Sequence, residues 1–513
     1  MFTYHPRINN LHLCSMTNSK EAWAQVTNNS IPLDYKSILQ WLINRQWTTQ
    51  SIADWQTFYN STSKTLIYDN GDNIILVDLP KLPDYQDFEP YQFTEFCVFN
   101  DLNPSLSVYC VQNLEQLRLV NTNLTILPEI KNFQRLQSLI IDTDNGVIDQ
   151  HLPSEIGQLG SLLALKLSNI TYLEDLPNEI EYWTKLQSLI LIGIPNFNKI
   201  PDEGFGKLSQ LTELRFIDLP NLSNIPSTIN NLQSLQQLEI NKTNINSLDL
   251  ENLYSLKSIL ISLNPNLISL NMKNLSLVAT ISVTYNQQLK TMTLENLPKL
   301  YISEFYSLSS LEEISFENVL SLSTISIVSN PKLKSISFIN IPTIKSLILS
   351  ECELTTFPES ILTLKSLQTL NMKSNKLSAL PLTFSTDLPN LKILNLENNQ
   401  FQGYIFQPPL IYVRELYLND NSFTFIDGIG KYKSLSILQL NKNQISSIPL
   451  EITGISPTLT RLFIENNLLT DIQYSMVNMR SLNVFYARNN SIPLEKRTAL
   501  EQLFARARKA FHV

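Results

Sequence analysis

One short pattern of apolar and variable residues recurs along most of this chain. It consists of an apolar residue, two variable residues, an apolar residue, one variable residue and a third apolar residue. The pattern opens seventeen times, at Leu114, Leu136, Leu162, Leu186, Leu211, Leu235, Leu256, Val278, Leu300, Leu322, Ile344, Leu367, Leu391, Val413, Leu435, Leu459 and Leu482. Successive openings lie 21 to 26 residues apart. Because self-similarity at a fixed period of this length is typical of repeat architectures, we predict a solenoid of stacked coils.

The segment Leu435–Ile445 shows what one repeat predicts. Leu438 and Leu440 alternate with variable residues, which is the period of a strand with one buried face. The chain then turns away at Asn443, whose carboxamide can pair with backbone groups that leave the strand inside the coil. The same position holds a polar residue in many repeats: Asn264, Asn286, Asn330, Asn375, Asn399, Asn421, Asn467, Asn490, Thr122, Asp144 and Thr243. We interpret this Asn ladder as structural, and ligand binding is the alternative.

The repeat resembles a known family. The segment Leu391–Phe401 reads LxxLxLxxNxL and is similar to the leucine-rich repeat. Returning segments of the form LPxxI resemble the outer arc of many such proteins: Leu152–Ile156, Leu176–Ile180, Ile225–Ile229 and Phe357–Ile361. The resemblance covers about three quarters of the chain. It implies an α/β repeat solenoid, a curved horseshoe with a parallel concave sheet of about seventeen strands, and protein binding as the usual role.

A shorter period lies inside the first one. From Ile245 to Ile344 similar units open every 11 residues, at Ile245, Leu256, Leu267, Val278, Leu289, Leu300, Leu311, Leu322, Leu333 and Ile344. Two such units make one coil, so we predict a second, convex sheet in the middle of the solenoid. The unit that opens at Leu300 is the weakest, because Ser303 stands where an apolar residue belongs.

The N-terminal region lacks the repeat. We predict three parts: a Trp-rich cap or small domain over residues 1–105, leucine-rich repeats over 106–493 and a C-terminal capping helix over 494–513. Thr65–Tyr68 and Ile74–Val77 flank an Asn70-Gly71 turn, which predicts a hairpin. The first part is therefore expected to be a small mixed α/β cap that covers the first coil. A separate recognition domain is the alternative.

The last segment, Leu494–Phe511, has apolar and basic residues at helical spacing. The apolar positions are Leu500, Leu503, Phe504, Ala507 and Phe511, and the basic ones are Lys496, Arg497, Arg506, Arg508 and Lys509. We predict a terminal helix that seals the last coil. The alternative is a basic amphipathic helix that contacts a membrane or an acidic partner.

Charge, cysteine content and the N-terminus limit the partners and the compartment. The net charge of −8 and the pI near 5.3 argue against a nucleic-acid partner, which requires a basic surface. The four cysteines, at positions 14, 97, 110 and 352, do not form a disulfide framework, although the family resemblance leaves a bridge between Cys97 and Cys110 open. The sequence shows neither a secretory signal nor an apolar stretch long enough to span a bilayer. We expect a cytoplasmic protein, and unconventional export is the alternative.

The residue types that carry chemistry are sparse. Four histidines occur without metal-site spacing, and 11 glycines provide no phosphate-binding loop. We therefore predict no catalytic residue, metal or cofactor, and expect a chain that is not an enzyme. The Asp-rich segment Asp142–Asp149 could bind calcium, but its spacing is not that of an EF-hand loop, and a solvated turn is the default reading.

The strand positions that face outward predict where a partner binds. In the last third of the chain these positions bring Tyr, Phe and Arg together, which is typical of binding hot spots. The predicted partner-binding residues are Tyr417, Asn419, Gln439, Arg461, Phe463, Glu465, Tyr486 and Arg488. The alternative is that these aromatic side chains only pack against cross-strand neighbours.

The function that these observations favour is a non-enzymatic scaffold that binds a protein on the concave face. The sequence leaves the identity of the partner and the oligomeric state open. Two alternatives belong to other classes. Residues 1–105 could form a small catalytic or ligand-binding unit that the repeats target, or the chain could be an exported adhesive or effector protein.

Overall fold

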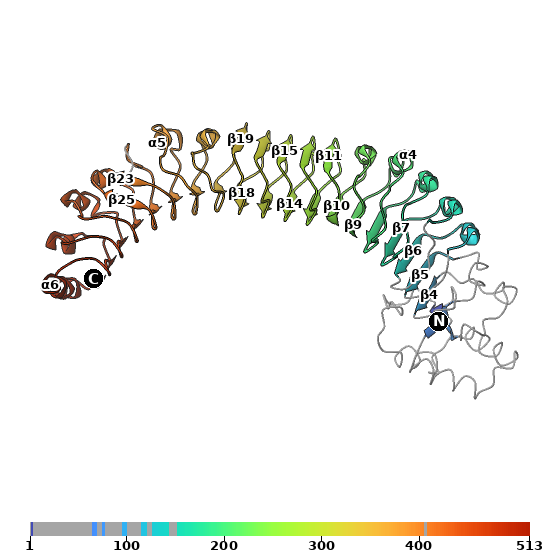
Figure 1. Ribbon diagram of the computed structural model, residues 1–513, viewed down its shortest axis with the longest axis horizontal. Coiled ribbons are helices and arrows are strands. Elements are labelled where there is room, and N and C mark those ends of the chain that lie inside the picture. Colours follow the sequence, from blue (N-terminus) through green and yellow to red (C-terminus); the bar gives the residue numbers. More distant parts are fainter. Residues whose placement is uncertain are drawn as a thin grey trace, which may run out of the picture. The chain divides into compact units, whose positions relative to one another are not determined.

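The computed structural model describes residues 114–120, 126–142, 151–404 and 408–513, and four short strands nearer the N-terminus. Contacts divide the chain into two compact units, Met1–Leu260 and Ile261–Val513. Each unit is a stack of coils, with strands along one edge and helical turns or further strands along the opposite edge (Figure 1). The four tryptophans of residues 1–105 and the side chains of Cys97 and Cys110 lie outside the described residues, so the predictions about them stay predictions.

All seventeen openings of the pattern lead into a β-strand that starts two residues later, as predicted. We call these the primary strands. In the first unit they are β5 (Gln116–Val120), β6 (Ser138–Asp142), β7 (Ala164–Ser168), β8 (Ser188–Ile192), β9 (Glu213–Leu219) and β10 (Gln237–Thr243). The division between the units falls within β12 (Ser258–Ser262). In the second unit they are β14 (Thr280–Thr284), β16 (Ile302–Tyr306), β18 (Thr324–Val328), β20 (Ser346–Ile348), β21 (Thr369–Asn371), β22 (Ile393–Asn395), β24 (Glu415–Tyr417), β26 (Ile437–Gln439), β27 (Arg461–Phe463) and β28 (Val484–Tyr486).

The primary strands pair in parallel and place each apolar position on the next. In the first unit, for example, Leu165 of β7 lies beside Leu189 of β8. In the second unit, Leu438 of β26 lies beside Leu462 of β27, and both side chains are fully buried. Because the side-chain period of a strand is two, the intervening residues face outward along the whole sheet. The core is therefore the continuous apolar space between neighbouring coils.

The returning arcs outside the middle of the chain contain short helical turns. The LPxxI segments form 3-10 turns in which the isoleucine is buried, as Ile156 and Ile361 show. The turns are η5 (Pro128–Asn132), η6 (Ser154–Gln158), η7 (Asn178–Tyr182), α4 (Asp202–Phe205), η8 (Ser227–Asn231), η9 (Glu359–Thr363), α5 (Phe384–Asp387), η10 (Ile429–Lys431), η11 (Leu450–Ile455) and η12 (Tyr474–Asn478). Proline at the start of most turns fixes the backbone before the helical residues.

The predicted second sheet is present in the middle of the chain. β11 (Ser247–Glu251) ends the returning arc of a coil in the first unit. In the second unit β13 (Ser269–Lys273), β15 (Thr291–Glu295), β17 (Glu313–Glu317) and β19 (Ser335–Ile339) form the secondary strands. β13, β15, β17 and β19 pair in parallel, each with the next. A two-stranded sheet of β23 (Gln402–Tyr404) and β25 (Ser422–Phe425) lies further along the chain.

Both ends add strands that the repeat pattern does not contain. Near the N-terminus, β2 (Lys64–Tyr68) and β3 (Ile74–Leu76) form the predicted hairpin, and β1 (Phe2–Thr3) and β4 (Glu95–Phe99) join them. β4 also pairs in parallel with β5 and so extends the primary strands by one. At the other end β29 (Ala510–His512) pairs in parallel with β28.

The C-terminal helix is shorter than the sequence predicted. α6 (Leu494–Arg506) begins where expected, and it buries Leu500 and Phe504. The assignment of Ala507 and Phe511 to this helix was wrong, because Ala507 caps it and Phe511 belongs to β29. The ring of Phe511 nevertheless stacks on Phe504, with 4.2 Å between ring centroids. The contact between Phe504 and Phe511 that a continuous helix would have made is therefore made by a helix and the strand that follows it.

The Asn ladder is structural, as predicted. Asn443 is buried, and its Oδ1 accepts a hydrogen bond from the backbone nitrogen of Phe423 at 3.0 Å. Its Nδ2 donates to the carbonyl oxygens of Leu418 at 3.0 Å and Leu440 at 3.1 Å. One side chain therefore satisfies backbone groups of its own coil and of the coil before it. The ladder changes at Cys352, whose Sγ lies 3.4 Å from the carbonyl oxygen of Ile327.

Candidate functional site

Five of the predicted partner-binding residues lie on the last four primary strands of the second unit, β24, β26, β27 and β28, and Asn419, Glu465 and Arg488 lie two residues beyond the ends of β24, β27 and β28. Parallel pairing places one residue of each strand in a row, which reads Tyr417, Gln439, Phe463, Tyr486 and, on β29, His512. We call this set the central row. A second row beside it reads Glu415, Ile437, Arg461 and Val484. The structure thus brings the predicted aromatic residues onto one outward face.

Three rings of the central row are in contact. The rings of Phe463 and Tyr486 meet edge to face, with centroids 5.4 Å apart. Tyr486 meets the ring of His512 at 4.6 Å, also close to perpendicular. All three side chains are half-buried. The cross-strand packing that the sequence left as an alternative is therefore real, and each ring still exposes part of its surface. Ring contacts of this kind hold the side chains in place before any partner arrives.

Tyr417 stands at the other end of the central row. Its hydroxyl donates a hydrogen bond to a carboxylate oxygen of Glu415 at 2.7 Å. Partial burial, followed by this hydrogen bond and the charge of Glu415, raises the pKa of Tyr417 to about 12. The phenol is therefore protonated at neutral pH, and it presents its ring and not a charge to the outside.

Carboxamides next to the central row are tied to one another and to the backbone. Asn419 donates from Nδ2 to the Oε1 of Gln439 at 2.7 Å. Its Oδ1 accepts from the backbone nitrogen of Asn441 at 2.8 Å, and Asn441 accepts in the same way from Glu465 at 2.7 Å. Because Asn419 is also mostly buried, it supports the face more than it lines it. Gln439 is held through its oxygen, which leaves its amide nitrogen as an outward donor.

The two predicted arginines are exposed, and neither has a carboxylate of a described residue within ion-pair distance. They lie on opposite sides of the Phe463–Tyr486 contact, Arg461 two residues before Phe463 and Arg488 two residues after Tyr486. The neighbouring Lys442, by contrast, pairs with Asp420 at 3.1 Å. An unpaired guanidinium beside an aromatic ring is a ready donor for a carboxylate.

Three residues of the site were not in the prediction. Glu415 holds Tyr417, Asn441 carries the backbone contacts between strands, and His512 closes the central row. Glu415 and Asn441 occupy outward positions of the repeat and could have been selected by position alone. His512 carried no signal, because its strand does not follow the repeat pattern.

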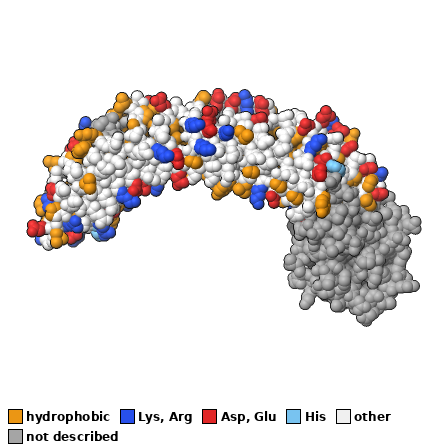
Figure 2. All heavy atoms as spheres, viewed as in Figure 1, with side chains coloured by type: hydrophobic (Ala, Val, Ile, Leu, Met, Phe, Trp, Pro, Cys, Tyr) orange, Lys and Arg blue, Asp and Glu red, His pale blue; other side chains and the backbone are white. Residues whose placement is uncertain are grey.

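On the outward face of the first unit, in contrast, an arginine is paired with carboxylates. Arg215 on β9 is neutralised by Glu213 at 2.8 Å and by Glu239 at 3.6 Å. Figure 2 shows basic and acidic side chains interspersed on the face that it draws, and not gathered into one patch of a single sign.

Within the described ranges no group of three or more His, Cys, Asp or Glu residues could hold a metal ion. Most of the proposed calcium-binding segment lies outside those ranges, and Asp142 itself accepts a hydrogen bond from Asn169 at 2.8 Å.

Comparison with known proteins agrees with the repeat architecture. Residues 342–401 match the family model described as leucine rich repeat. This segment contains the primary strands β20, β21 and β22 with their buried leucines. The sequence match, together with the parallel strands at every repeat, identifies the chain as a leucine-rich repeat protein.

Several curated relatives share part of the chain. Receptor-like protein 18 of Arabidopsis thaliana is 31% identical over 157 residues, which cover 28% of this chain and 18% of that protein. Receptor-like protein 35 of the same plant is 32% identical over 161 residues, which cover 28% of this chain and 16% of that protein. An adenylate cyclase of Schizosaccharomyces pombe is 28% identical over 146 residues, which cover 26% of this chain and 9% of the cyclase. Each match thus spans less than a fifth of the relative's length.

Solved structures are similar at the level of the fold. A leucine-rich repeat protein of Leptospira interrogans is 24% identical, with a TM-score of 0.32 over 80% of this chain and 86% of that chain. The Toll–Spatzle complex of Drosophila matches at 16% identity, with a TM-score of 0.42 over 76% of this chain and 52% of that chain. These TM-scores are too low to carry an argument about the site. Every helix in the described part of the chain is too short or too polar to cross a bilayer.

Proposed function

We propose that this chain is a non-enzymatic protein-binding scaffold and that its partner contacts the central row and the two arginines beside it. The observation that carries the proposal is the row Tyr417–Gln439–Phe463–Tyr486–His512, in which large rings are held in contact and stay partly exposed. Rings of this kind bring large contact area at a low cost in conformational entropy, which is why they dominate binding hot spots.

The two arginines indicate which side chains the partner carries. Arg461 and Arg488 flank the ring contact and have no carboxylate of a described residue to pair with. The amide nitrogen of Gln439 adds another outward donor between them. We therefore propose a partner segment that carries an apolar or aromatic side chain with acidic side chains on both sides of it. Such a segment would pair with both guanidinium groups while its apolar side chain covers Phe463 and Tyr486.

The experiment that tests the site compares two triple variants in affinity capture. The site variant is Tyr417→Ala/Phe463→Ala/Tyr486→Ala. The control variant is Tyr172→Ala/Tyr254→Ala/Tyr301→Ala, which removes three tyrosines that are at least half exposed and lie outside the site. We expect the site variant to lose the captured partner by more than 100-fold, since each lost anchor contributes about 2 kcal/mol or more. Equal capture by both folded variants would remove the site.

A second variant tests the chemistry of the partner. Arg461→Glu/Arg488→Glu replaces both unpaired cations by anions at exposed positions. We expect this change to abolish capture at low salt and to leave the thermal midpoint unchanged, because neither side chain stabilises the fold through an ion pair with a described residue. Wild-type capture should also weaken as salt rises. Capture that is unchanged by charge reversal would exclude an acidic partner segment.

The alternatives stay predictions. A catalytic or ligand-binding unit in residues 1–105 would lie outside the described residues. We keep the cytoplasm as the proposed compartment and export as its alternative, and cell fractionation distinguishes the two. The partial matches to receptor-like proteins and to an adenylate cyclase concern less than a third of this chain.

A further inference from the structure

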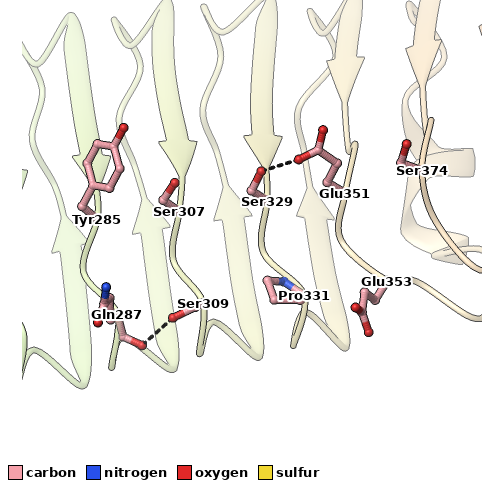
Figure 3. Close-up of a pocket in the computed structure, with 9 residues that line it drawn as sticks. All are labelled: Tyr285, Gln287, Ser307, Ser309, Ser329, Pro331, Glu351, Glu353 and Ser374. Atoms are coloured by element: carbon pink, nitrogen blue, oxygen red, sulfur yellow. Dashed lines mark hydrogen bonds between the residues drawn. The ribbon is translucent and has the colours of Figure 1, made fainter.

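A groove lined mostly by Ser, Glu and Gln residues lies in the second unit, away from the central row. It occupies about 550 Å³ and follows the turns that leave the primary strands β14, β16, β18, β20 and β21. Figure 3 shows its lining as two parallel rows of side chains, to which each of the first four turns contributes one residue per row and the fifth contributes Ser374 alone. The first row is Tyr285, Ser307, Ser329, Glu351 and Ser374, and the second is Gln287, Ser309, Pro331 and Glu353. With coils about 4.8 Å apart, four steps make a groove about 19 Å long.

The backbone at the first row is left-handed in every turn. Tyr285, Ser307 and Ser329 each have a φ of 57°, and Glu351 has a φ of 58°. The equivalent residues of the later coils are Asn398, Asp420, Lys442, Asn466 and Asn489, and Leu263 holds the position in the coil before Tyr285. Asn and Asp tolerate this conformation, whereas a tyrosine or a glutamate there is strained. Strained residues that line a groove are a reason to look for a function, because other residues would fold more easily.

The groove offers hydrogen-bonding side chains and one aromatic face. Tyr285 is 48% exposed, and its ring is held edge to face against Tyr306 at 5.7 Å between centroids. The hydroxyl of Ser329 donates to Glu351 at 2.6 Å, and that of Ser309 donates to the carbonyl oxygen of Gln287 at 3.2 Å. The carboxylate of Glu351 keeps its second oxygen as an acceptor. Pro331 is the only aliphatic side chain in the lining that the structure describes.

This lining does not fit an extended peptide. The backbone nitrogens of Tyr285, Ser307 and Ser329 already donate to carbonyl oxygens of the next coil, at 3.2, 3.2 and 3.1 Å. A peptide therefore finds few free main-chain donors for strand addition. It also finds no apolar pocket for its side chains, although such pockets carry most of the affinity in protein recognition.

We propose that the groove binds a neutral oligosaccharide. Hydroxyl groups both donate and accept, so a row of sugar hydroxyls matches the row of serine hydroxyls, the amide of Gln287 and the carboxylate of Glu351. The ring of Tyr285 provides a flat face for one sugar ring at the end of the groove. The carboxylate of Glu353 is occupied by Lys376 at 2.6 Å, so the groove does not present two free anions to a cationic ligand.

Calorimetry with the full-length chain tests this inference. The probes are glucose hexamers in β-1,4, β-1,3 and α-1,4 linkage, with spermine as the cationic probe. We expect saturable binding of at least one hexamer and no saturable binding of spermine. Tyr285→Asn should weaken the hexamer by about tenfold or more and raise the thermal midpoint, because Asn relieves the left-handed strain while it removes the aromatic face. The failure of all three hexamers to bind at millimolar concentration would overturn the proposal, and so would binding of spermine alone.

Matched variants separate this groove from other surfaces. Tyr301→Ala removes a tyrosine of equal exposure (50%) outside the lining and should leave hexamer binding unchanged. Glu351→Gln should weaken binding and keep the fold, since the side chain is exposed. The triple variant of the central row should bind the hexamer as the wild type does. Loss of hexamer binding in the Tyr301→Ala variant or in the central-row variant would contradict the assignment to this groove.

Discussion

Two regions of the second unit close the same kind of coil in different ways. In residues 267–352, the two-sheet coils, the primary strands β14, β16 and β18 have five residues each and alternate with secondary strands. In residues 367–490, the C-terminal coils, the primary strands shrink to three residues, and the returning arcs contain mostly short helical turns. The buried Asn ladder has gaps in the first region, at Leu308 and Cys352. It is unbroken in the second through Asn375, Asn399, Asn421, Asn443, Asn467 and Asn490.

The comparison shows how a solenoid satisfies its backbone. Longer strands on both arcs pair most backbone groups of the two-sheet coils directly. Where strands are short, the buried carboxamides take over the groups that remain. The two-sheet coils carry a second, more exposed ladder at their outer corner, where Asn296, Asn318 and Asn340 each donate to the preceding ladder residue at 2.8 to 2.9 Å. The regions also differ outside, since small Ser and Thr side chains cover the middle and rings and charges cover the C-terminal coils.

The largest loss of stability is expected when an asparagine of the buried ladder in the C-terminal coils is replaced. Asn443→Ala leaves the Phe423 nitrogen without its acceptor. It also removes one of two amide donors from each of the Leu418 and Leu440 carbonyl oxygens, which still accept from Asn421 and Asn467. We expect a loss of about 3 kcal/mol in the free energy of unfolding, measured by urea denaturation. The control Asn483→Ala changes an exposed asparagine of a neighbouring coil and should alter stability by less than about 0.5 kcal/mol. Equal effects of the two variants would contradict the structural role.

Removal of a buried hydroxyl group from the two-sheet coils should raise the free energy of unfolding. Ser303 is buried between Ile281 and Ile325 on neighbouring strands, and its hydroxyl has no hydrogen-bond partner among the described residues. Ser303→Val and Ser303→Thr introduce side chains of equal shape that differ in the hydroxyl. We expect the Val variant to be more stable than the Thr variant by about 1–2 kcal/mol in urea denaturation. A Thr variant of equal or greater stability would mean that the hydroxyl is satisfied.

The outer ladder should contribute less than the buried one. Asn318→Gly keeps the positive φ of 54° without strain and removes two amide–amide hydrogen bonds. We expect a loss of about 1 kcal/mol, because these groups are partly solvated. Asn340→Gly removes one such bond and should cost about half as much. A loss as large as that of Asn443→Ala would reverse the proposed division between the two ladders.

The smallest effect on stability at neutral pH is expected from the ionisation of Cys352. Burial raises the pKa of the Cys352 thiol from 9.0 to about 12. Because the folded-state pKa is the higher one, the neutral thiol stabilises the fold fully below pH 9, and this contribution is lost as the pH rises toward 12. In the background Cys14→Ser/Cys97→Ser/Cys110→Ser, we expect a thiol reagent at pH 9 to react slowly with the folded chain and rapidly in urea. Rapid reaction of the folded chain would place Cys352 at the surface.

The repeat phase predicted most of the fold. Apolar residues recur at the positions of Leu438 and Leu440 in every described coil except the one that holds Ser303, so one residue pattern predicted all the primary strands and the inward face. The half-period around Leu289 and Leu333 predicted the secondary strands for the same reason. The outer ladder was also visible in the sequence, since its residues recur every 22 positions, but it was not recognised.

Other features depend on where the chain packs and not on period. Phe511 has helical spacing from Phe504, yet pairing with β28 draws it into a strand. This strand also brings His512 to the central row. The groove depends on left-handed turns at Tyr285 and the equivalent residues of the next coils. The pattern of apolar residues does not predict these backbone angles. Tyr417, Gln439, Phe463 and Tyr486 of the central row were predicted because they occupy outward strand positions, and the role of the row in binding stays a proposal.

Site-specific photo-crosslinking compares the two regions most directly. Gln439 lies in the central row, and Ser326 holds the equivalent outward position on β18 of the two-sheet coils. A photoreactive amino acid at Gln439 should form a covalent adduct with the captured partner, whereas the same group at Ser326 should form none. Adducts from Ser326 without adducts from Gln439 would contradict the placement of the partner on the C-terminal coils.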